Sequence, residues 1–260
     1  MYLDWSAWEP LYREVATDLG LSIPNDYSTA EKYKLAVEHR FKDGCSPLIS
    51  QIASWKKIKA WIFGAGPSLE QDFITFQQHF SSEKDLVVGV DGASLFLREK
   101  GYVPDLIFSD GDGSLDAILD CVTNGSILIL HAHGDNYSII DKLLSKIKIY
   151  TFIPTVQTKP AEPYLYNFGG FTDGDRAISA VLEWFTGITV LLVGFTFGNV
   201  QGRYSKPHKL KNHAEASEFK LKKLAFAKKY IAILAKSYPN QIFNLSKPTD
   251  SIQGVSESFF

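Results

Sequence analysis

Two aspartates separated by a single glycine follow a short apolar stretch at residues 106–108. Asp110 and Asp112 stand in the sequence SDGDGS, where Gly111 and Gly113 let the backbone curl so that both carboxylates can face one cation. A site built from oxygen ligands favours Mg²⁺, which keeps part of its water shell and is usually completed by substrate phosphates. An ordinary Asp-Gly turn that closes a strand is the alternative. The pattern predicts a magnesium site at the end of a buried strand.

A second polar cluster, HAHGDN, follows the apolar stretch 127–130 and contains His131, His133, Asp135 and Asn136. Histidines that alternate after a strand are typical of metallohydrolases, in which His131, His133 and Asp135 would bind zinc or manganese. Neutral imidazoles can also hydrogen-bond to phosphate or to a heterocycle, and an imidazolium can offset phosphate charge. Both interpretations place this cluster in a functional site.

A glycine-rich turn follows the apolar stretch 60–63, with Gly64 and Gly66 ahead of Pro67 and Ser68. Glycines leave room for a phosphate, and a helix that opens at Ser68 would offer free amides to an anion. The third glycine of the dinucleotide-binding pattern is replaced by Leu69, so a plain helix cap explains the turn equally well.

Asp91 ends the next apolar stretch, 86–90, and is followed by Gly92. At the end of a strand its carboxylate can ligate a metal, bind a ribose hydroxyl or cap the following helix. The sequence does not separate these three roles.

Acidic and basic side chains stand together in the sequence GGFTDGDRA. Thr172 can cap a helix whose first turn holds Asp173 and Asp175, and the helix dipole alone favours acids there. It does not explain Arg176, which we predict grips a phosphate group in two-point fashion. Gln157 lies upstream, in a polar turn after the stretch 147–156.

The segment from Arg203 to Lys236 is strongly basic. The chain from Asn199 to Lys211 is polar, basic and interrupted by Pro207, which predicts a mobile loop. Arg203 and Lys206 in this loop are predicted to close over a polyphosphate as a lid. Lysines 220, 222 and 223 of the following amphipathic helix are weaker candidates, since most lysines of such a helix form a solvated face.

Apolar stretches alternate with helical spacing from residue 59 onward, and each of the clusters above follows one such stretch. This order predicts βαβ units, and therefore an α/β fold of the Rossmann-like, three-layer type with a mainly parallel sheet. The clusters then meet at the carboxyl ends of the strands, where open α/β sheets bind ligands. Helical spacing without strands, including a helix capped by Ser28 and another over residues 46–57, predicts an N-terminal helical segment at 1–58. The α/β core is predicted at 59–200, and a basic loop, an amphipathic helix and a final strand at 201–260.

Composition narrows the class of protein. A formal net charge of -2 argues against a general nucleic-acid binder. No apolar run reaches about 18 residues, so no membrane-spanning segment is expected. Cys45 and Cys121 lack metal-binding or disulfide-framework spacing, which fits a reducing cytoplasm. A homo-oligomer is compatible with these features but not specified by them.

A glycine turn, an acidic pair suited to Mg²⁺ and a basic lid together indicate phosphoryl or diphosphoryl transfer from a nucleotide such as ATP. The sequence lacks GxxxxGK[ST], the usual P-loop, and the strand lysine, HRD and DFG of protein kinases. A nucleotide would therefore be held in another way.

The motifs GAGPSLE, DGA, PDLIFSDGDG, HAHGDN, NFGGFTDGDRA and GRYSK…KLKKL resemble, in the same order, those of the archaeal 6-hydroxymethyl-7,8-dihydropterin diphosphokinases. That family is also called the domain of unknown function 115, and its core is similar to that of thiamine diphosphokinase. The resemblance covers Ala60 to Ala235. It implies Mg²⁺-dependent transfer of diphosphate from ATP to the reduced pterin, giving AMP and the pterin diphosphate for tetrahydrofolate or tetrahydromethanopterin synthesis.

The resemblance also implies roles for the matching residues. The nucleotide loop would be shaped by Gly64, Gly66, Pro67 and Ser68. Magnesium would be held by Asp110 and Asp112 with Asp91 nearby, and the lid would be Arg203 and Lys206. The transfer site would be lined by His131, His133, Asp135 and Asn136, and flanked by Asp173, Asp175 and Arg176. Family members often have an apolar residue where this chain has Gly111, which implies a looser metal site here.

A pterin would need a flat slot with an acceptor for its donor edge. Asp173 or Asp135 could pair with that edge, and Phe168 or Phe171 could stack on the ring, although core packing explains both phenylalanines as well. Three other functions stay open: a nucleotide-sugar-dependent glycosyltransferase like relatives that modify flagellin, a nucleotide-binding regulator without turnover, and a metallophosphatase.

Overall fold

The computed structural model describes residues 5–148, 151–246 and 251–259. Its centre is a parallel sheet of seven strands in the order β5-β4-β3-β2-β1-β6-β9. The strands are β1 (Lys59–Phe63), β2 (Asp85–Val90), β3 (Leu106–Ser109), β4 (Ile127–Ala132), β5 (Phe152–Val156), β6 (Thr189–Val193) and β9 (Ile242–Asn244). A separate antiparallel pair joins β7 (Val200–Gln201) to β8 (Ala214–Glu215). Each apolar stretch predicted as a strand contains a strand. In the stretch 147–156, β5 begins only at Phe152, and residues 149 and 150 lie outside the described part.

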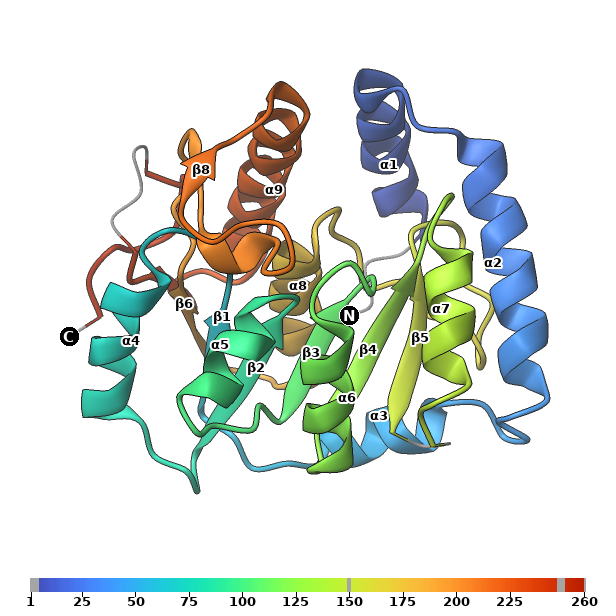
Figure 1. Ribbon diagram of the computed structural model, residues 1–260, viewed down its shortest axis with the longest axis horizontal. Helices are drawn as coiled ribbons and strands as arrows, with labels where there is room; N and C mark the ends of the chain where they lie inside the picture. The colour runs from blue at the N-terminus through green and yellow to red at the C-terminus, as the bar shows by residue number, and fades with distance from the viewer. Residues whose placement is uncertain (1–4, 149–150, 247–250, 260) are drawn as a thin grey trace.

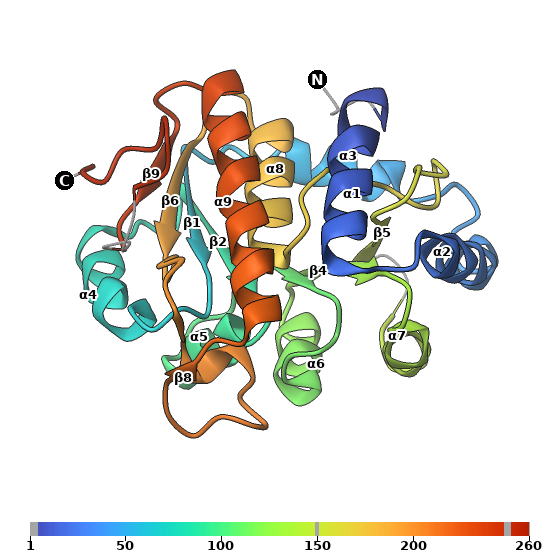
Figure 2. The ribbon, with the colours of Figure 1, turned by 90° about the horizontal axis from the view of Figure 1, so that it is seen from above.

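Helices cover both faces of the sheet (Figure 2). One face carries α4 (Leu69–His79), α5 (Ala93–Glu99), α6 (Leu115–Thr123) and α7 (Tyr137–Leu144). The other carries α1 (Trp5–Leu19), α3 (Ser46–Ala53), α8 (Asp173–Trp184) and α9 (Glu218–Ser237), and α2 (Ile23–Glu38) lies beyond β5. Because helices bury both faces, β2, β3, β4 and β5 are buried along their whole length, which is why they are apolar runs rather than alternating ones. The predicted three-layer α/β fold is confirmed.

The chain changes direction in the sheet at β1. From β1 to β5 each new strand is added on one side, and α8 then carries the chain back to β6 on the other side of β1. The connections that leave the carboxyl ends of β1 and β6 therefore diverge. In open parallel sheets a crevice forms at this switch point, and ligands bind there. The glycine turn after β1 and Gly194 after β6 both lie at this place.

The N-terminal helices dock on the sheet. Figure 1 shows α1 and α9 rising above the carboxyl ends of the strands, with α2 beside α7. The buried hydroxyl of Tyr33 on α2 donates to the carbonyl of Leu130 on β4, at 3.2 Å. Buried side chains of α1, α2 and α3 form one continuous hydrophobic cluster with those of the sheet. The residues above the strand ends are therefore held by the same core as the strands.

Two N-terminal helix boundaries differ from the prediction. The second helix begins at Ile23 rather than at Ser28, because the side chain of Ser22 accepts a hydrogen bond from the Asn25 amide and caps it. Pro24 fits in that first turn, where its missing N–H costs nothing. The third helix ends at Ala53 rather than near Lys57.

The basic segment predicted as a mobile loop up to Lys211 holds regular structure. It contains β7 and a 3₁₀ turn at Arg203–Ser205, and β7 pairs with β8. A Cβ on Gly202 would lie 2.3 Å from the carbonyl oxygen of Ala65, so this segment packs directly on the glycine turn. No helix in the described part of the chain has the length and apolar character needed to cross a membrane.

Candidate active site

A cavity of about 150 Å³ opens at the switch point. Its floor includes the glycine turn after β1 and the turn after β6. The Gly66 amide donates to the carbonyl of Gly194 at 2.9 Å, and a Cβ on Gly66 would lie 2.4 Å from that oxygen. Gly66 is therefore required first for the close approach of two turns, and the open floor of the cavity follows from that approach.

Three carboxylates converge in this cavity. Asp91 follows β2, Asp110 follows β3, and Asp173 opens α8. Each offers one oxygen atom, and the three oxygens all lie within 4.8 Å of one another. Asp91 adopts a φ of 44°, a left-handed backbone that is uncommon outside glycine and indicates a constrained site.

The electrostatic environment of these three carboxylates favours the binding of a cation. Burial, and then the charges of Asp173 and Asp110, raise the pKa of Asp91 well above its ordinary value. Its buried Oδ1 has no hydrogen-bond partner among the described residues. Crowded, partly unpartnered carboxylate oxygens are costly unless a positive ion joins them, and oxygen-only ligands suit Mg²⁺. The residues present therefore fit a divalent cation.

Asp112 lies outside this group of three but lines the same cavity, and burial, with the charges of Asp110 and Asp173, raises its pKa to about 6. Gly111 has a φ of 87°, and the Asp112 amide turns back to donate to Oδ1 of Asp110 at 3.0 Å. This turn leaves the side chain of Asp112 exposed in the cavity lining.

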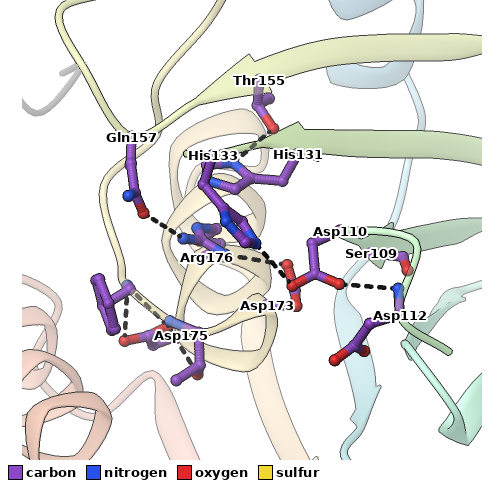
Figure 3. A network of polar contacts seen from close by, with 12 residues as sticks. Ser109, Asp110, Asp112, His131, His133, Thr155, Gln157, Asp173, Asp175 and Arg176 are labelled. Carbon is purple, nitrogen blue, oxygen red and sulfur yellow. Dashed lines mark hydrogen bonds and ion pairs between the residues drawn. The ribbon is translucent and has the colours of Figure 1, made fainter. Parts of the chain in front are cut away.

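His133 connects the carboxylate group to a neighbouring space. Its Nε2 lies 3.2 Å from Oδ2 of Asp110 (Figure 3). Its Nδ1 lies 3.0 Å from Oδ1 of the exposed Asp135. Burial acts to raise the pKa of Asp110, but the hydrogen bond and charge of His133 outweigh it and lower that pKa below its ordinary value. Asp110 is therefore held ionised, as a metal ligand must be.

His131 and Asn136 lie beneath the site and line neither of the two large cavities. Nδ1 of His131 lies 3.1 Å from Thr155 Oγ1. The Asn136 side chain donates to the carbonyls of Asp110 and His131 and accepts from the His133 amide. Asn136 thus locks the turns after β3 and β4 together. Among the described residues, the group that could share a metal contains no histidine, so the geometry does not favour a zinc or manganese site at His131 and His133.

Arg176 is buried and bonded to protein groups. It donates to Oδ1 of Asp173 at 3.1 Å and to Oε1 of Gln157 at 3.3 Å (Figure 3). The arginine therefore orients Asp173 rather than projecting freely toward a phosphate.

Asp175 closes a capping box with Thr172 at the start of α8. Its fully buried carboxylate accepts hydrogen bonds from the amides of Phe171 and Thr172 and from the Thr172 hydroxyl. This accounts for Asp175 by helix capping, without a substrate.

The two residues predicted to form the lid lie in different environments. Lys206 lines the cavity together with Lys220 and Lys223 of α9. Arg203 instead forms an ion pair with Glu70 on α4, at 2.6 Å. Burial and the charge of Lys223 lower the pKa of Lys220, while the aspartates opposite raise it. The cavity therefore sets three lysines against its carboxylates.

The last two residues of the glycine turn, Pro67 and Ser68, have a structural position. Pro67 and Ser68 are absent from the described residues that line the cavity. The Ser68 hydroxyl donates to Asp72 at 2.7 Å, and Asp72 also accepts from the Gly194 amide. Ser68 therefore braces the two turns rather than facing a ligand.

A second cavity of about 290 Å³ lies beside the first and shares Asp110 and Lys223 with it. His133, Asp135, Gln157, Phe171 and Arg176 line it. Phe168 lies elsewhere, stacked on Tyr166 and edge-on to Trp184 in the core.

Residues 37–202 match the family model described as 6-hydroxymethylpterin diphosphokinase MptE-like. The chain belongs to this family.

Relatives of the MptE-like family with curated names extend the match over most of the chain. The 6-hydroxymethyl-7,8-dihydropterin pyrophosphokinase of Pyrococcus furiosus is 33% identical over 94% of this chain and 100% of its own length. The enzyme of that name from Methanocaldococcus jannaschii is 33% identical over 89% of this chain and 96% of its own length. The one from Methanothermobacter thermautotrophicus is 35% identical over 68% and 73%. Among solved structures, the Maf glycosyltransferase of Magnetospirillum magneticum AMB-1 aligns with a TM-score of 0.48 and 15% identity, over 80% of this chain and 37% of that one.

Sequence reasoning missed one feature of this MptE-like site and treated another as a weaker candidate. Asp173 joins the carboxylate group only because α8 returns beside β2 and β3 after the chain has left β5. Lys220 and Lys223 reach the cavity because α9 packs on α8, a contact far apart in sequence. The spacing of the acids within GGFTDGDRA was the available signal for Asp173, but helix capping explained it equally well.

Proposed function

We propose that this chain transfers the β,γ-diphosphate of ATP to the hydroxymethyl group of 6-hydroxymethyl-7,8-dihydropterin, with Mg²⁺ as cofactor, and releases AMP. The pterin diphosphate would then serve the synthesis of tetrahydrofolate or tetrahydromethanopterin. The names of three relatives support the reaction class. The observation that carries the proposal is the group of Asp91, Asp110 and Asp173 opposite three lysines in one cavity at the switch point.

The first cavity suits the phosphates of ATP. Lys206, Lys220 and Lys223 supply positive charge for phosphate oxygens. Asp91, Asp110 and Asp173 would hold the magnesium ion, which neutralises phosphate charge and fixes phosphate geometry when bound. Arg176 and Gln157 keep Asp173 oriented toward its partners. Catalysis of this kind depends on positioning and charge neutralisation more than on covalent chemistry.

In the reaction the hydroxymethyl oxygen forms a bond to the β-phosphorus of ATP. The bond from that phosphorus to the oxygen bridging it to the α-phosphorus breaks, and AMP leaves with that oxygen. The hydroxyl proton passes to Asp135, an exposed carboxylate that lines the second cavity. Because phosphoryl-type transition states are loose, proton removal contributes less than the charges do.

The products of the purified protein test this function. The protein, ATP, Mg²⁺ and the reduced pterin are incubated, and nucleotides are separated by chromatography. AMP should form only when all components are present, in equal amount to the pterin diphosphate. Formation of ADP would indicate a single-phosphoryl kinase instead, and no consumption of ATP with the pterin would overturn the proposal.

A further inference from the structure

The second cavity has walls that no matched motif contains. One wall is the turn between α1 and α2 together with the first turn of α2, with Leu21, Asn25 and Asp26, and another wall is formed by Phe219 near the start of α9. These residues lie outside the range 37–202 that matches the family model. The N-terminal helices and α9 thus build a space beside the carboxylate group that the α/β core alone does not enclose.

The two cavities differ in the charged side chains that line them. The first cavity contains three lysines, as a polyphosphate requires. The second contains Lys223, shared with the first, and Arg176, whose guanidinium is already bonded to Asp173 and Gln157. It also contains the carboxylates of Asp26, Asp110 and Asp135, which disfavour a polyphosphate. The second cavity therefore suits an uncharged molecule rather than a second nucleotide.

Asp26 supplies an acceptor for the edge of such a molecule. It is 4% exposed, and its Oδ2 accepts from the Tyr12 hydroxyl and from Nε2 of Gln157, each at 2.7 Å. Its Oδ1 accepts from the Gly134 amide, also at 2.7 Å. A carboxylate can accept about four hydrogen bonds, so this rigidly held group retains capacity for one more donor. The pterin ring presents adjacent N–H groups on its pyrimidine edge.

Apolar side chains supply surfaces for a flat ring. Leu21 is half-buried and Phe171 is buried, and both line the cavity. Phe219 lines it too although it is 50% exposed, an uncommon position for a phenylalanine without a partner surface. At about 290 Å³ the space lies close to the lower end of the range of roughly 300–1,000 Å³ typical of small-molecule sites.

The residues that line both cavities indicate how a bound acceptor would be oriented. Asp110 and Lys223 belong to both cavities, and His133 lies between Asp110 and the second cavity. A hydroxymethyl group at this junction would face phosphates in the first cavity. We propose that the second cavity is the binding site of the acceptor, a flat dihydropterin, and that the α1–α2 turn and Phe219 are its walls. This assignment rests on the proposed function and adds the acceptor site to it.

Filling the cavity tests the assignment. Leu21→Trp should raise the dissociation constant for 6-hydroxymethyl-7,8-dihydropterin at least about tenfold, because the larger side chain occupies the ring space. Leu35→Trp, on the solvent face of α2 at 59% exposure, is the matched control and should change nothing. Both constants, for the pterin and for a non-hydrolysable ATP analogue with Mg²⁺, are measured by calorimetry. The constant for the ATP analogue should stay unchanged in both variants.

Removing an aromatic wall gives a second test that does not strain the fold. Phe219→Ala should weaken pterin binding by roughly threefold to tenfold, the range expected for loss of an aromatic contact. Leu221→Ala is the control, because Leu221 is exposed on the same helix and belongs to neither cavity lining. Asp26→Asn keeps the shape of the side chain and should also raise the dissociation constant for the pterin. The melting temperature of this variant reports any effect on the fold.

The outcomes separate this assignment from the proposed function. Suppose that the wild type forms AMP, and that Leu21→Trp and Phe219→Ala bind the pterin as tightly as the wild type does. The acceptor site then lies elsewhere, and the proposed reaction still stands. If those variants weaken the ATP analogue instead, the cavity belongs to the nucleotide and the assignment is overturned. If the wild type neither binds the pterin nor forms AMP, both proposals are overturned together.

Discussion

Asp91, Asp110 and Asp173 occupy three positions that differ in how they are held. Asp110 is fixed by His133 and by the Asp112 amide, and Asp173 is fixed by Arg176. Oδ1 of Asp91 is buried and has no hydrogen-bond partner in the described part of the chain, and burial and the acidic neighbours of Asp91 raise its pKa. Two oriented carboxylates beside a third whose charged form is unfavourable support the proposed binding of a cation.

Substitution of Asp173 and substitution of Asp112 should therefore lower kcat by different amounts. Asp173→Asn should lower kcat by roughly 100-fold or more, because charge stabilisation by a bound metal is worth several kcal/mol. Asp112→Asn should lower it less than about tenfold, since Asp112 is exposed and lies outside the shared group. Steady-state rates at saturating ATP and pterin give both values, with circular dichroism to verify folding. An equal loss in the two variants would contradict the ligand set described above.

His131 predicts a dependence of stability on pH. Burial, and then the charge of Arg176, lower the pKa of His131 well below its ordinary value of about 6.5. The unfolded chain then binds this proton more readily than the folded chain, so stability is full above that value and is lost as the pH falls below it. The slope approaches about 1.4 kcal/mol per pH unit for one group.

Urea unfolding of wild type and His131→Gln between neutral and mildly acidic pH measures this contribution. The variant should lose less stability on acidification than the wild type. His208→Gln, at an exposed position, serves as the control and should follow the wild type. A wild-type acid slope retained in His131→Gln would rule out His131 as its source.

At the scale of elements, the first turn of α8 determines where Asp173 points. The capping box of Thr172 and Asp175 fixes the helix start, and Arg176 one turn on bonds back to Asp173. Acidic residues that look alike in the sequence therefore have different tasks: Asp173 faces the cavity and Asp175 holds the turn.

Asp175→Ala should reduce the free energy of unfolding by about 2–4 kcal/mol, because it removes the cap and leaves buried donors unpaired. Asp116→Ala, at an exposed position in the first turn of α6, loses only a helix-dipole interaction and should cost less than about 1 kcal/mol. Denaturant unfolding compares the two. Similar small losses would mean that Asp175 is not the structural cap.

At the scale of the whole molecule, the N-terminal helices share the core of the sheet. Tyr33 is fully buried on α2, whereas Tyr27 on the same helix is 39% exposed. Tyr33→Ala should lower the free energy of unfolding of the entire chain by about 3–5 kcal/mol, and Tyr27→Ala by less than about 1 kcal/mol. Far-ultraviolet circular dichroism during heating should show one transition shifted as a unit. A split transition in Tyr33→Ala would show that the helices unfold independently of the sheet.

Local patterns predicted the strands and most helices, because strands covered on both faces must be apolar runs and helices carry caps such as Thr172. They also predicted Asp110, His133 and the glycine turn, each of which directly follows a strand. They did not predict that Asp173 lies with Asp91 and Asp110, or that Arg203 forms an ion pair with Glu70. Those outcomes depend on how α8 and α9 return to the sheet, which is set by contacts between segments far apart in the chain.

The fate of the β-phosphorus of ATP tests the central claim most directly. ATP labelled with ³²P at the β position is incubated with the protein, Mg²⁺ and 6-hydroxymethyl-7,8-dihydropterin, and the products are separated. The diphosphoryl transfer proposed here predicts that the label moves into the pterin product in equal amount to unlabelled AMP. Label recovered in ADP or in inorganic phosphate would contradict it.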